Sequence, residues 1–176
     1  MSNQRVYIGI DPGLKGFIAV NDGKNIEFLS IDDNDFYAIS DFFTKIKEKY
    51  DNVVCVMEEV HAIFGASAKS TFTFGEINGL LKGLFIANKI PYHLIQPKVW
   101  QKEIWDNKDM DVSYSIEFRN GKEINKKVIN TKQTSINAAK RLFPTIDLRK
   151  TNRCKNYDDN KCDSLLLSEY GRRKNL

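Results

Sequence analysis

Residues 5–20, RVYIGIDPGLKGFIAV, decide the predicted fold. Apolar, β-branched and aromatic residues dominate 5–10 and 17–20, and the six residues between them include one proline and two glycines. This pattern is typical of two strands joined by a turn. A third strand near 25–30 continues the pair, so we expect the chain to begin with an antiparallel meander.

Downstream of the meander, helical and strand patterns alternate. Residues 40–47 repeat apolar side chains at helical spacing, and the apolar run 53–57 predicts a buried central strand. Thr73 and Glu76 have the spacing of a capping box, which predicts a helix from there to about Asn88. Further elements are expected at 92–95 (strand), from Pro97 (helix), at 132–142 (helix) and at about 157–172 (helix). We therefore predict one α/β domain over residues 1–176, with a mixed central β-sheet, antiparallel first strands and flanking helices.

Residues 112–129, VSYSIEFRNGKEINKKVI, form a separate pattern. Polar and apolar residues alternate on both sides of Asn120-Gly121, which is a strong two-residue hairpin signal. We expect a β-hairpin insertion here, which either contacts a polyanion through its basic residues or extends the edge of the sheet.

Composition excludes several classes of protein. The 176 residues are 41% hydrophobic and 28% charged, which fits one globular domain and is too apolar for a disordered chain. We find neither a membrane-spanning run nor a secretory signal, so we expect a cytoplasmic protein. Three cysteines and two histidines make a disulfide framework or a Cys/His zinc site improbable.

The formal net charge of +4 conceals an asymmetry. Residues 22–59 carry ten acids and four lysines, whereas residues 119–155 carry eleven bases and two acids. The basic segment favours a polyanionic partner, although a solvated lysine-rich face has the same composition.

Glycine recurs at every fourth position in the expected helix 74–88. Gly75, Gly79 and Gly83 leave a smooth face on which another element can pack closely, either within the fold or across a dimer.

Acidic residues follow two of the expected strands and recur on the last helix. Asp11 ends the first strand, and Glu58 and Glu59 end the strand 53–57, where parity directs them to opposite faces. Asp159 and Asp163 are four residues apart on one helix face. Asp11 also fits an ordinary turn aspartate, and Asp159 also fits an N-terminal helix cap or a partner of the helix dipole. Converging carboxylates without His or Cys favour Mg²⁺ or Mn²⁺.

These residues resemble the motifs of one family. Residues 9–13 (GIDPG) with Gly16 are similar to the first motif of RuvC-type Holliday-junction resolvases, which belong to the RNase H-like superfamily. Residues 57–61 (MEEVH) resemble their second acidic motif, and 159–167 (DNKCDSLLL) their C-terminal helix with paired aspartates. The segments 62–75, 90–92 and 97–100 resemble the bacteriophage and mobile-element branch.

The resemblance implies an RNase H-like fold and a set of metal ligands. Asp11, Glu58, Asp159 and Asp163 match the catalytic carboxylates, which bind Mg²⁺ and also work with Mn²⁺. Cellular members usually place the last two aspartates three residues apart, which corresponds to Asn160 here, whereas many phage sequences place them four apart. Asp159 is therefore preferred, with Asp158 and Asn160 in reserve.

The implied activity is that of a metal-dependent endonuclease. It resolves four-way (Holliday) and related branched DNA junctions by paired nicks that leave 5′-phosphate and 3′-hydroxyl ends. A homodimer formed through helix 74–88 supplies one site for each strand. Two alternatives remain open: another RNase H-like nuclease that acts on flaps or RNA/DNA hybrids, and a non-catalytic protein that binds branched DNA.

Candidate DNA contacts lie in three segments. The loop 61–72 combines basic and aromatic residues suited to stacking on unpaired bases, although Phe64 also fits a hydrophobic lid and His61 a structural role. Family members often carry a catalytic lysine just after the Trp100 position, where this chain has Gln101, so Lys98 or Lys102 is the candidate substitute. The candidate DNA-binding residues are Phe64, Lys69, Ser70, Lys98, Lys102, Arg119, Lys122, Lys126 and Lys127.

Overall fold

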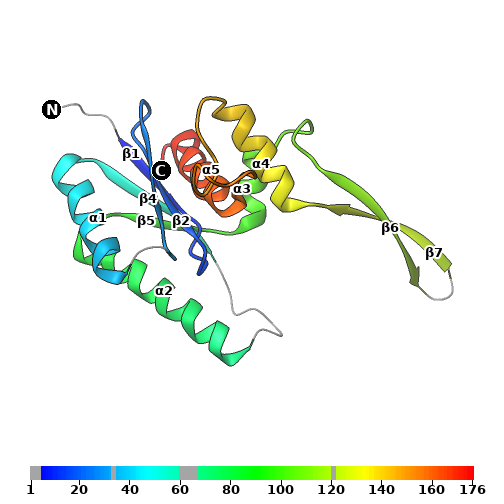
Figure 1. The fold of residues 1–176 in the computed structure, drawn as a ribbon, viewed down its shortest axis with the longest axis horizontal. Helices are drawn as coiled ribbons and strands as arrows, with labels where there is room; N and C mark the ends of the chain where they lie inside the picture. The colour runs from blue at the N-terminus through cyan, green and yellow to red at the C-terminus, as the bar shows by residue number, and fades with distance from the viewer. Residues whose placement is uncertain (1–4, 33–34, 60–66, 120–121) are drawn as a thin grey trace.

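A computed structural model describes residues 5–32, 35–59, 67–119 and 122–176. Five helices and two β-sheets make up these residues (Figure 1). None of the described helices has the length and apolar character needed to cross a membrane. The strands are β1 (Val6–Ile10), β2 (Phe17–Asn21), β3 (Ile26–Ser30), β4 (Val53–Glu58), β5 (Tyr92–Ile95), β6 (Val112–Arg119) and β7 (Lys122–Ile129). The helices are α1 (Phe36–Lys49), α2 (Ala68–Ala87), α3 (Pro97–Ile104), α4 (Thr131–Leu142) and α5 (Asp159–Lys174).

The central sheet is mixed, as the sequence predicts. Its strand order is β3-β2-β1-β4-β5, and β1 pairs antiparallel with β2 and parallel with β4. The meander β1–β3 is antiparallel throughout, and β5 adds to β4 in parallel. This confirms the expected α/β fold with antiparallel first strands.

Helices cover both faces of the central sheet. Ile8 and Ile10 of β1 contribute to a core with α1 and α2, whereas Val56 of β4 lies in a second core with α3, α4 and α5. Figure 1 shows these two groups of helices on opposite sides of the sheet. Strand parity therefore assigns each residue beyond a strand end to one of the two layers.

Helix α5 lies unusually close to the sheet at two glycines. A Cβ on Gly9 would lie 1.9 Å from the carbonyl oxygen of Ser164 and 2.3 Å from the amide nitrogen of Ser168. At the far end of the helix, a Cβ on Gly171 would lie 2.7 Å from Cγ2 of Val56. The absence of a side chain at Gly9 thus allows α5 to pack close to β1 at Ser164, the residue that follows Asp163.

Helix α2 begins earlier than the sequence pattern predicts. It begins at Ala68, and the Ser67 hydroxyl caps it by accepting a hydrogen bond of 3.1 Å from the Ser70 amide. The prediction of a helix start at Thr73 was wrong, because Ser67 supplies a cap before the capping-box spacing is reached. Lys69 and Ser70 consequently lie in the first turn of a helix, not in a loop.

The glycine face of α2 is open to solvent. The helix packs on the sheet through Ile77, Leu81 and Phe85, whereas a Cβ on Gly75, Gly79 or Gly83 would have no atom of the described chain within 4 Å. The expectation that these glycines admit another element of the same fold was therefore wrong, and the expectation of a dimer contact stays a prediction.

The hairpin β6–β7 forms its own two-stranded sheet and projects from the body (Figure 1). The two strands lie where the sequence predicts them, but they do not pair with the central sheet, so the expected alternative of an edge extension was wrong. Tyr114, Ile116 and Phe118 make an exposed row on one face, with exposed fractions of 72%, 62% and 73%. The base of the hairpin is closed by a hydrogen bond of 2.9 Å from the Asn130 amide to the Asp111 carbonyl.

Candidate active site

Two carboxylates extend from adjacent parallel strands at the same edge of the sheet. Asp11 follows β1, and Glu58 ends β4, where Ile10 and Met57 are register partners. Glu58 points to the same face of the sheet as Val56, which is the face that α5 covers. Glu59 points to the same face as Met57, which is the opposite one. Parity thus places Glu58, and not Glu59, on the side of the sheet that α5 covers.

Asp11 is also the turn aspartate that the sequence allows. Its Oδ1 accepts a hydrogen bond of 3.4 Å from the Gly13 amide, and its own amide donates to the Phe17 carbonyl at 3.1 Å. The turn fixes the backbone of Asp11, so the two interpretations of this residue are compatible.

Helix α5 brings two further aspartates over the same edge. Asp158 is the N-cap, and its Oδ1 accepts a hydrogen bond of 3.0 Å from the Lys161 amide. The suggestion that Asp159 caps the helix was therefore wrong, whereas its place in the first turn fits the alternative of a helix-dipole partner. Asp159 begins the helix, and Asp163 follows one turn later beside Ser164, which lies over Gly9.

Burial and mutual repulsion raise the pKa values of these carboxyl groups. Burial raises the pKa of Asp11 to about 6, with smaller contributions from the charges of Asp159 and Asp158. Burial and then the charge of Asp11 raise the pKa of Glu58 to about 7. Asp163 has its pKa well above the ordinary value, first through burial and then through Asp11, Glu58 and Asp159. Such coupling requires that the four carboxylates share one small region.

Asp163 carries an unsatisfied oxygen inside this region. Its Oδ1 is buried and has no hydrogen-bond partner among the described residues, while the Ser135 side chain favours its ionised form. A buried carboxylate oxygen without a donor fits a hard cation, because oxygen ligands are those that Mg²⁺ prefers. Among the described residues, however, no three His, Cys, Asp or Glu side chains lie close enough to form a metal cluster. Ion binding therefore requires these carboxylates to move closer together.

Lys132, which the sequence analysis missed, contacts the acidic group directly. Its Nζ lies 2.7 Å from Oδ2 of Asp159, and the hydrogen bond to Asp159, followed by the charges of Asp159 and Asp163, raises the pKa of this lysine. Lys98 and Lys102 are exposed on α3 and make no ion pair with these acids in the described part of the chain. The only sequence signal for Lys132 was its place in the first turn of a helix, because its partner lies 27 residues further along the chain.

Trp100 forms the floor beside Glu58. Its side chain is fully buried and meets Trp105 edge to face, with ring centroids 6.0 Å apart. The indole Nε1 is near enough to Glu58 to lower the pKa of this carboxyl group in part, yet it finds no acceptor at hydrogen-bond geometry. The indole therefore adds a polarising N–H to an otherwise apolar wall.

A basic cavity of about 590 Å³ adjoins the acids. Lys132, Lys140 and Lys155 line it together with Asp159 and Tyr157. The Lys140 ammonium lies 5.4 Å from the centroid of the Tyr157 ring. Lysine charges and carboxylates thus meet along one side of the site.

The remaining predicted DNA-binding residues lie apart from the acids. Lys69 and Ser70 are exposed at the start of α2, and Lys122, Lys126 and Lys127 are exposed along β7. Lys126 forms an ion pair of 2.6 Å with Glu117. Phe64, His61 and the side chain of Arg119 lie outside the part of the chain that the structure describes.

Comparison with known proteins adds structural relatives only. No protein-family model and no curated protein sequence matches the chain. Two solved structures of *Thermus thermophilus* RuvC are similar to it. One is in complex with a Holliday junction substrate (9% identity, TM-score 0.58) and the other is described as the RuvC structure (12% identity, TM-score 0.55), and each alignment covers 97% of this chain and 96% of the other. The chain therefore has the RuvC-like, RNase H-type fold over nearly its whole length.

Proposed function

We propose that the protein is a metal-dependent endonuclease that resolves four-way and related branched DNA junctions. The observation that carries the proposal is that Asp11, Glu58 and Asp163 meet at one edge of the sheet with raised pKa values, and that a buried oxygen of Asp163 has no hydrogen-bond partner among the described residues. A fold must compensate for the repulsion within such a cluster, and perturbed carboxylates in this arrangement are typical of functional sites.

Asp11, Glu58, Asp159 and Asp163 are the proposed ligands of Mg²⁺ or Mn²⁺. Bound divalent ions would supply Lewis acidity at the scissile phosphate and lower the pKa of an attacking water. Asp11 directly follows the central strand β1, and its charge raises the pKa of both Glu58 and Asp163, so it is the proposed ligand shared by the two sides of the site. No histidine base is required.

Lys132 is the proposed catalytic lysine in place of Lys98 or Lys102. Its ammonium already contacts Asp159, so it orients this carboxylate and offsets part of the negative charge that would repel DNA. The neighbouring Lys140 and Lys155 offer further positive charge for the phosphates that flank the cleaved bond.

We propose that selectivity for junctions comes from two features outside the acidic residues, which are a dimer contact through α2 and the hairpin β6–β7. One similar structure is RuvC in complex with a Holliday junction substrate, and a two-fold dimer would place one site on each of two equivalent strands. The open glycine face of α2 is the proposed subunit contact, because no atom of the described chain covers it and Phe72 and Ile86 are exposed on the same helix.

The hairpin β6–β7 is the proposed grip on a DNA arm. It begins beside the site, since only Asn130 and Thr131 separate β7 from Lys132. Lys122, Lys126 and Lys127 extend along it, and the strands reach about 27 Å from the body at 3.4 Å a residue. Lys69 and Ser70 on α2 are the second proposed contact.

A cleavage panel tests the proposal. The protein is incubated with Mg²⁺ and a synthetic four-way junction, a flap, an RNA/DNA hybrid or a plain duplex, alongside Asp11→Asn and Asp163→Asn. We expect paired, symmetric nicks in the junction from the wild type and none from either variant, while both variants still bind the junction. Preferential cleavage of the hybrid's RNA strand would falsify the proposed substrate, and nicking by both variants would refute the proposed metal site.

A further inference from the structure

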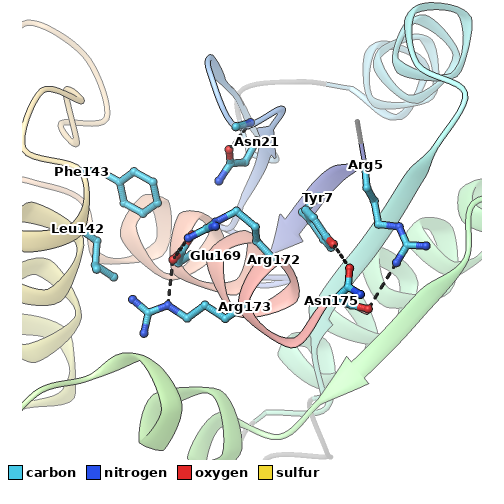
Figure 2. Close-up of a pocket in the computed structure, with 10 residues that line it drawn as sticks. Arg5, Tyr7, Asn21, Leu142, Phe143, Glu169, Arg172, Arg173 and Asn175 are labelled. Atoms are coloured by element: carbon cyan, nitrogen blue, oxygen red, sulfur yellow. Dashed lines mark hydrogen bonds and ion pairs between the residues drawn. The ribbon is translucent and has the colours of Figure 1, made fainter. Parts of the chain in front are cut away.

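A second cavity lies at the opposite end of the sheet from the acids. Its volume is about 750 Å³, and it opens between the end of α4, the strands β1 and β2, and the last turns of α5 (Figure 2). Arg5 precedes β1 and Asp11 follows it, so the two sites are about 20 Å apart along the strand. Nothing in the proposed nuclease chemistry uses this cavity.

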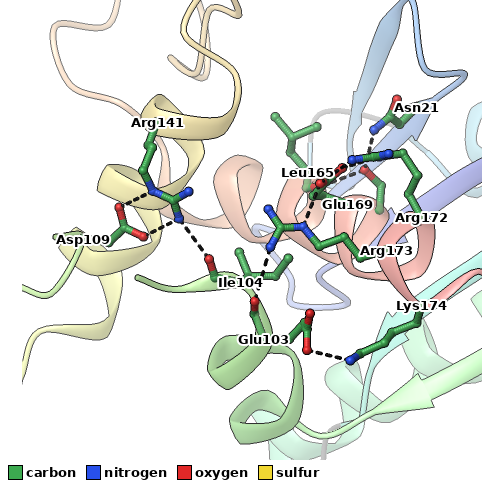
Figure 3. A network of polar contacts seen from close by, with 11 residues as sticks. Asn21, Glu103, Ile104, Asp109, Arg141, Leu165, Glu169, Arg172, Arg173 and Lys174 are labelled. Atoms are coloured by element: carbon green, nitrogen blue, oxygen red, sulfur yellow. Dashed lines mark hydrogen bonds and ion pairs between the residues drawn. The ribbon is translucent and has the colours of Figure 1, made fainter. Parts of the chain in front are cut away.

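The charges that line the cavity do not balance. Glu169, whose side chain is 5% exposed, accepts two hydrogen bonds of 2.7 and 2.8 Å from Arg172 and one of 2.9 Å from Arg173 (Figure 3). No other carboxylate of the described residues pairs with either arginine. Two guanidinium groups thus share a single buried anion, which leaves one positive charge uncompensated at the wall.

Both arginines keep hydrogen-bond donors available. Arg172 uses only Nε and Nη2 on Glu169, and its Nη1 makes no hydrogen bond to the described residues. Arg173 uses Nε on Glu169 and Nη1 on the carbonyl of Glu103, and its Nη2 has no partner among them. The Arg172 side chain is 53% exposed, so a ligand can reach it.

Arg5 adds a third guanidinium from a different element. It is held by Oδ1 of Asn52 at 3.3 Å and by the main-chain oxygens of Asn175 and Leu176. Arginines from the N-terminal strand and from α5 therefore line one cavity, and Figure 2 shows Tyr7 and Phe143 beside them.

We propose that this cavity binds a phosphate group. A planar guanidinium donates paired N–H groups that match phosphate oxygens, and a phosphate would supply the negative charge that the pair of arginines lacks. Glu169 is a positioning residue, because it binds the guanidinium groups of Arg172 and Arg173 at the side of the cavity and does not itself contact the ligand. The phosphate comes either from the backbone of a DNA arm, which rests on the proposed function, or from a free phosphate compound, which does not.

Pyrophosphate binding without metal tests the site. The probe is pyrophosphate in EDTA at constant ionic strength, measured by calorimetry and by its effect on thermal unfolding. Arg172→Gln should weaken binding at least tenfold, since it removes charge-assisted hydrogen bonds. Arg149→Gln, which loses the same charge in a surface pair with Asp147, should change it less than twofold. Phosphate bound by the lysines beside Asp159 contributes equally to both variants and cancels in the comparison.

Glu169→Gln should change the affinity for pyrophosphate in the opposite direction from Arg172→Gln. Removing the shared anion should tighten pyrophosphate binding and make the variant more dependent on pyrophosphate for its thermal stability. If this variant does not fold, the pair Arg172→Gln and Arg149→Gln still decides the question.

Junction and duplex binding in EDTA identify the source of the phosphate. If Arg172→Gln also weakens DNA binding and lowers the salt slope by about one, the ligand is a DNA phosphate. If only pyrophosphate binding is lost, the ligand is a free phosphate compound. Equal pyrophosphate binding by wild type and Arg172→Gln, or none by the wild type, would overturn the proposal. Neither assay measures nicking, so a failure of the proposed nuclease activity is seen separately.

Discussion

Replacing Asp11 with asparagine should stabilise the metal-free protein at neutral pH. The folded-state pKa of Asp11 is about 6 against an ordinary 3.8, so the folded protein opposes ionisation of this carboxyl group. A raised pKa costs no stability well below pH 3.8, and the cost grows between pH 4 and 6 and is complete above that range. Asparagine has the same shape and no charge, so it removes the cost while it can still accept from the Gly13 amide.

The size of the effect follows from the pKa values. A shift of about two units corresponds to about 3 kcal/mol at pH 7.5 and to less than about 1 kcal/mol at pH 4. Because Asp11 is only partly buried by exposed area, these figures are upper bounds. Urea unfolding of wild type and Asp11→Asn in EDTA at both pH values measures the difference.

A matched control has the opposite sign. Burial raises the pKa of Asp22, but hydrogen bonds from Asn25 and Lys24 lower it more, so the pKa falls to about 2. Asp22→Asn should therefore destabilise the protein at pH 7.5. If Asp11→Asn is less stable than wild type at pH 7.5, or gains as much at pH 4, the electrostatic account of the acidic cluster is wrong. In a separate measurement, added Mg²⁺ should stabilise the wild type more than Asp11→Asn, because the variant has lost a proposed metal ligand.

Four further predictions concern other parts of the molecule. Gly9→Ala should lower the free energy of unfolding by about 1–3 kcal/mol and nicking at least tenfold, because its Cβ displaces α5 and Asp163, whereas Gly75→Ala has open space within α2 and should raise the free energy of unfolding by about 0.5–1 kcal/mol. Lys132→Met should reduce nicking at least tenfold with partial recovery in Lys132→Arg, and Lys98→Met should not; equal effects at the two lysines would contradict the assignment. Replacing 112–129 with a Gly-Gly link between Asp111 and Asn130 should preserve the circular dichroism spectrum and weaken junction binding at least tenfold; unchanged affinity would remove the hairpin from the interface. Gly79→Arg should leave the fold intact and give a monomer in light scattering with unpaired nicks, and a dimer of unchanged mass would exclude the glycine face as the contact.

The sequence predicts the strands and the acids better than it predicts their surroundings. Alternation and turn chemistry are local, so β1, β2 and the hairpin lie where the pattern places them. Choosing between Glu58 and Glu59 from the strand pattern requires knowing which face of the sheet α5 covers. The position of α5 depends on its close approach to Gly9, and a glycine has no side chain that could signal this packing in the sequence. The start of α2 was misplaced because two capping signals compete and Ser67 comes first.

Sequence charge also overstates the basic surface available to DNA. Of the eleven bases in 119–155, five form ion pairs with carboxylates: Lys126 with Glu117, Lys132 with Asp159, Arg141 with Asp109, Arg149 with Asp147 and Lys150 with Asp32. Four of these five acids lie outside the basic segment 119–155, so counting charges along the chain does not reveal the pairing.

The same pairing explains why the proposed interface is divided between distant elements. Arg141 donates to both oxygens of the buried Asp109 and to the carbonyl of Ile104, so it holds α4 against the end of α3 and is not available to DNA. Lys122 and Lys127 make no ion pair among the described residues, and they lie on the hairpin that the body does not support by packing. Arg141 and Lys132 therefore stabilise the geometry of the site, and the bases proposed for phosphate are divided between Lys140 and Lys155 beside the acids and the lysines of the projecting hairpin.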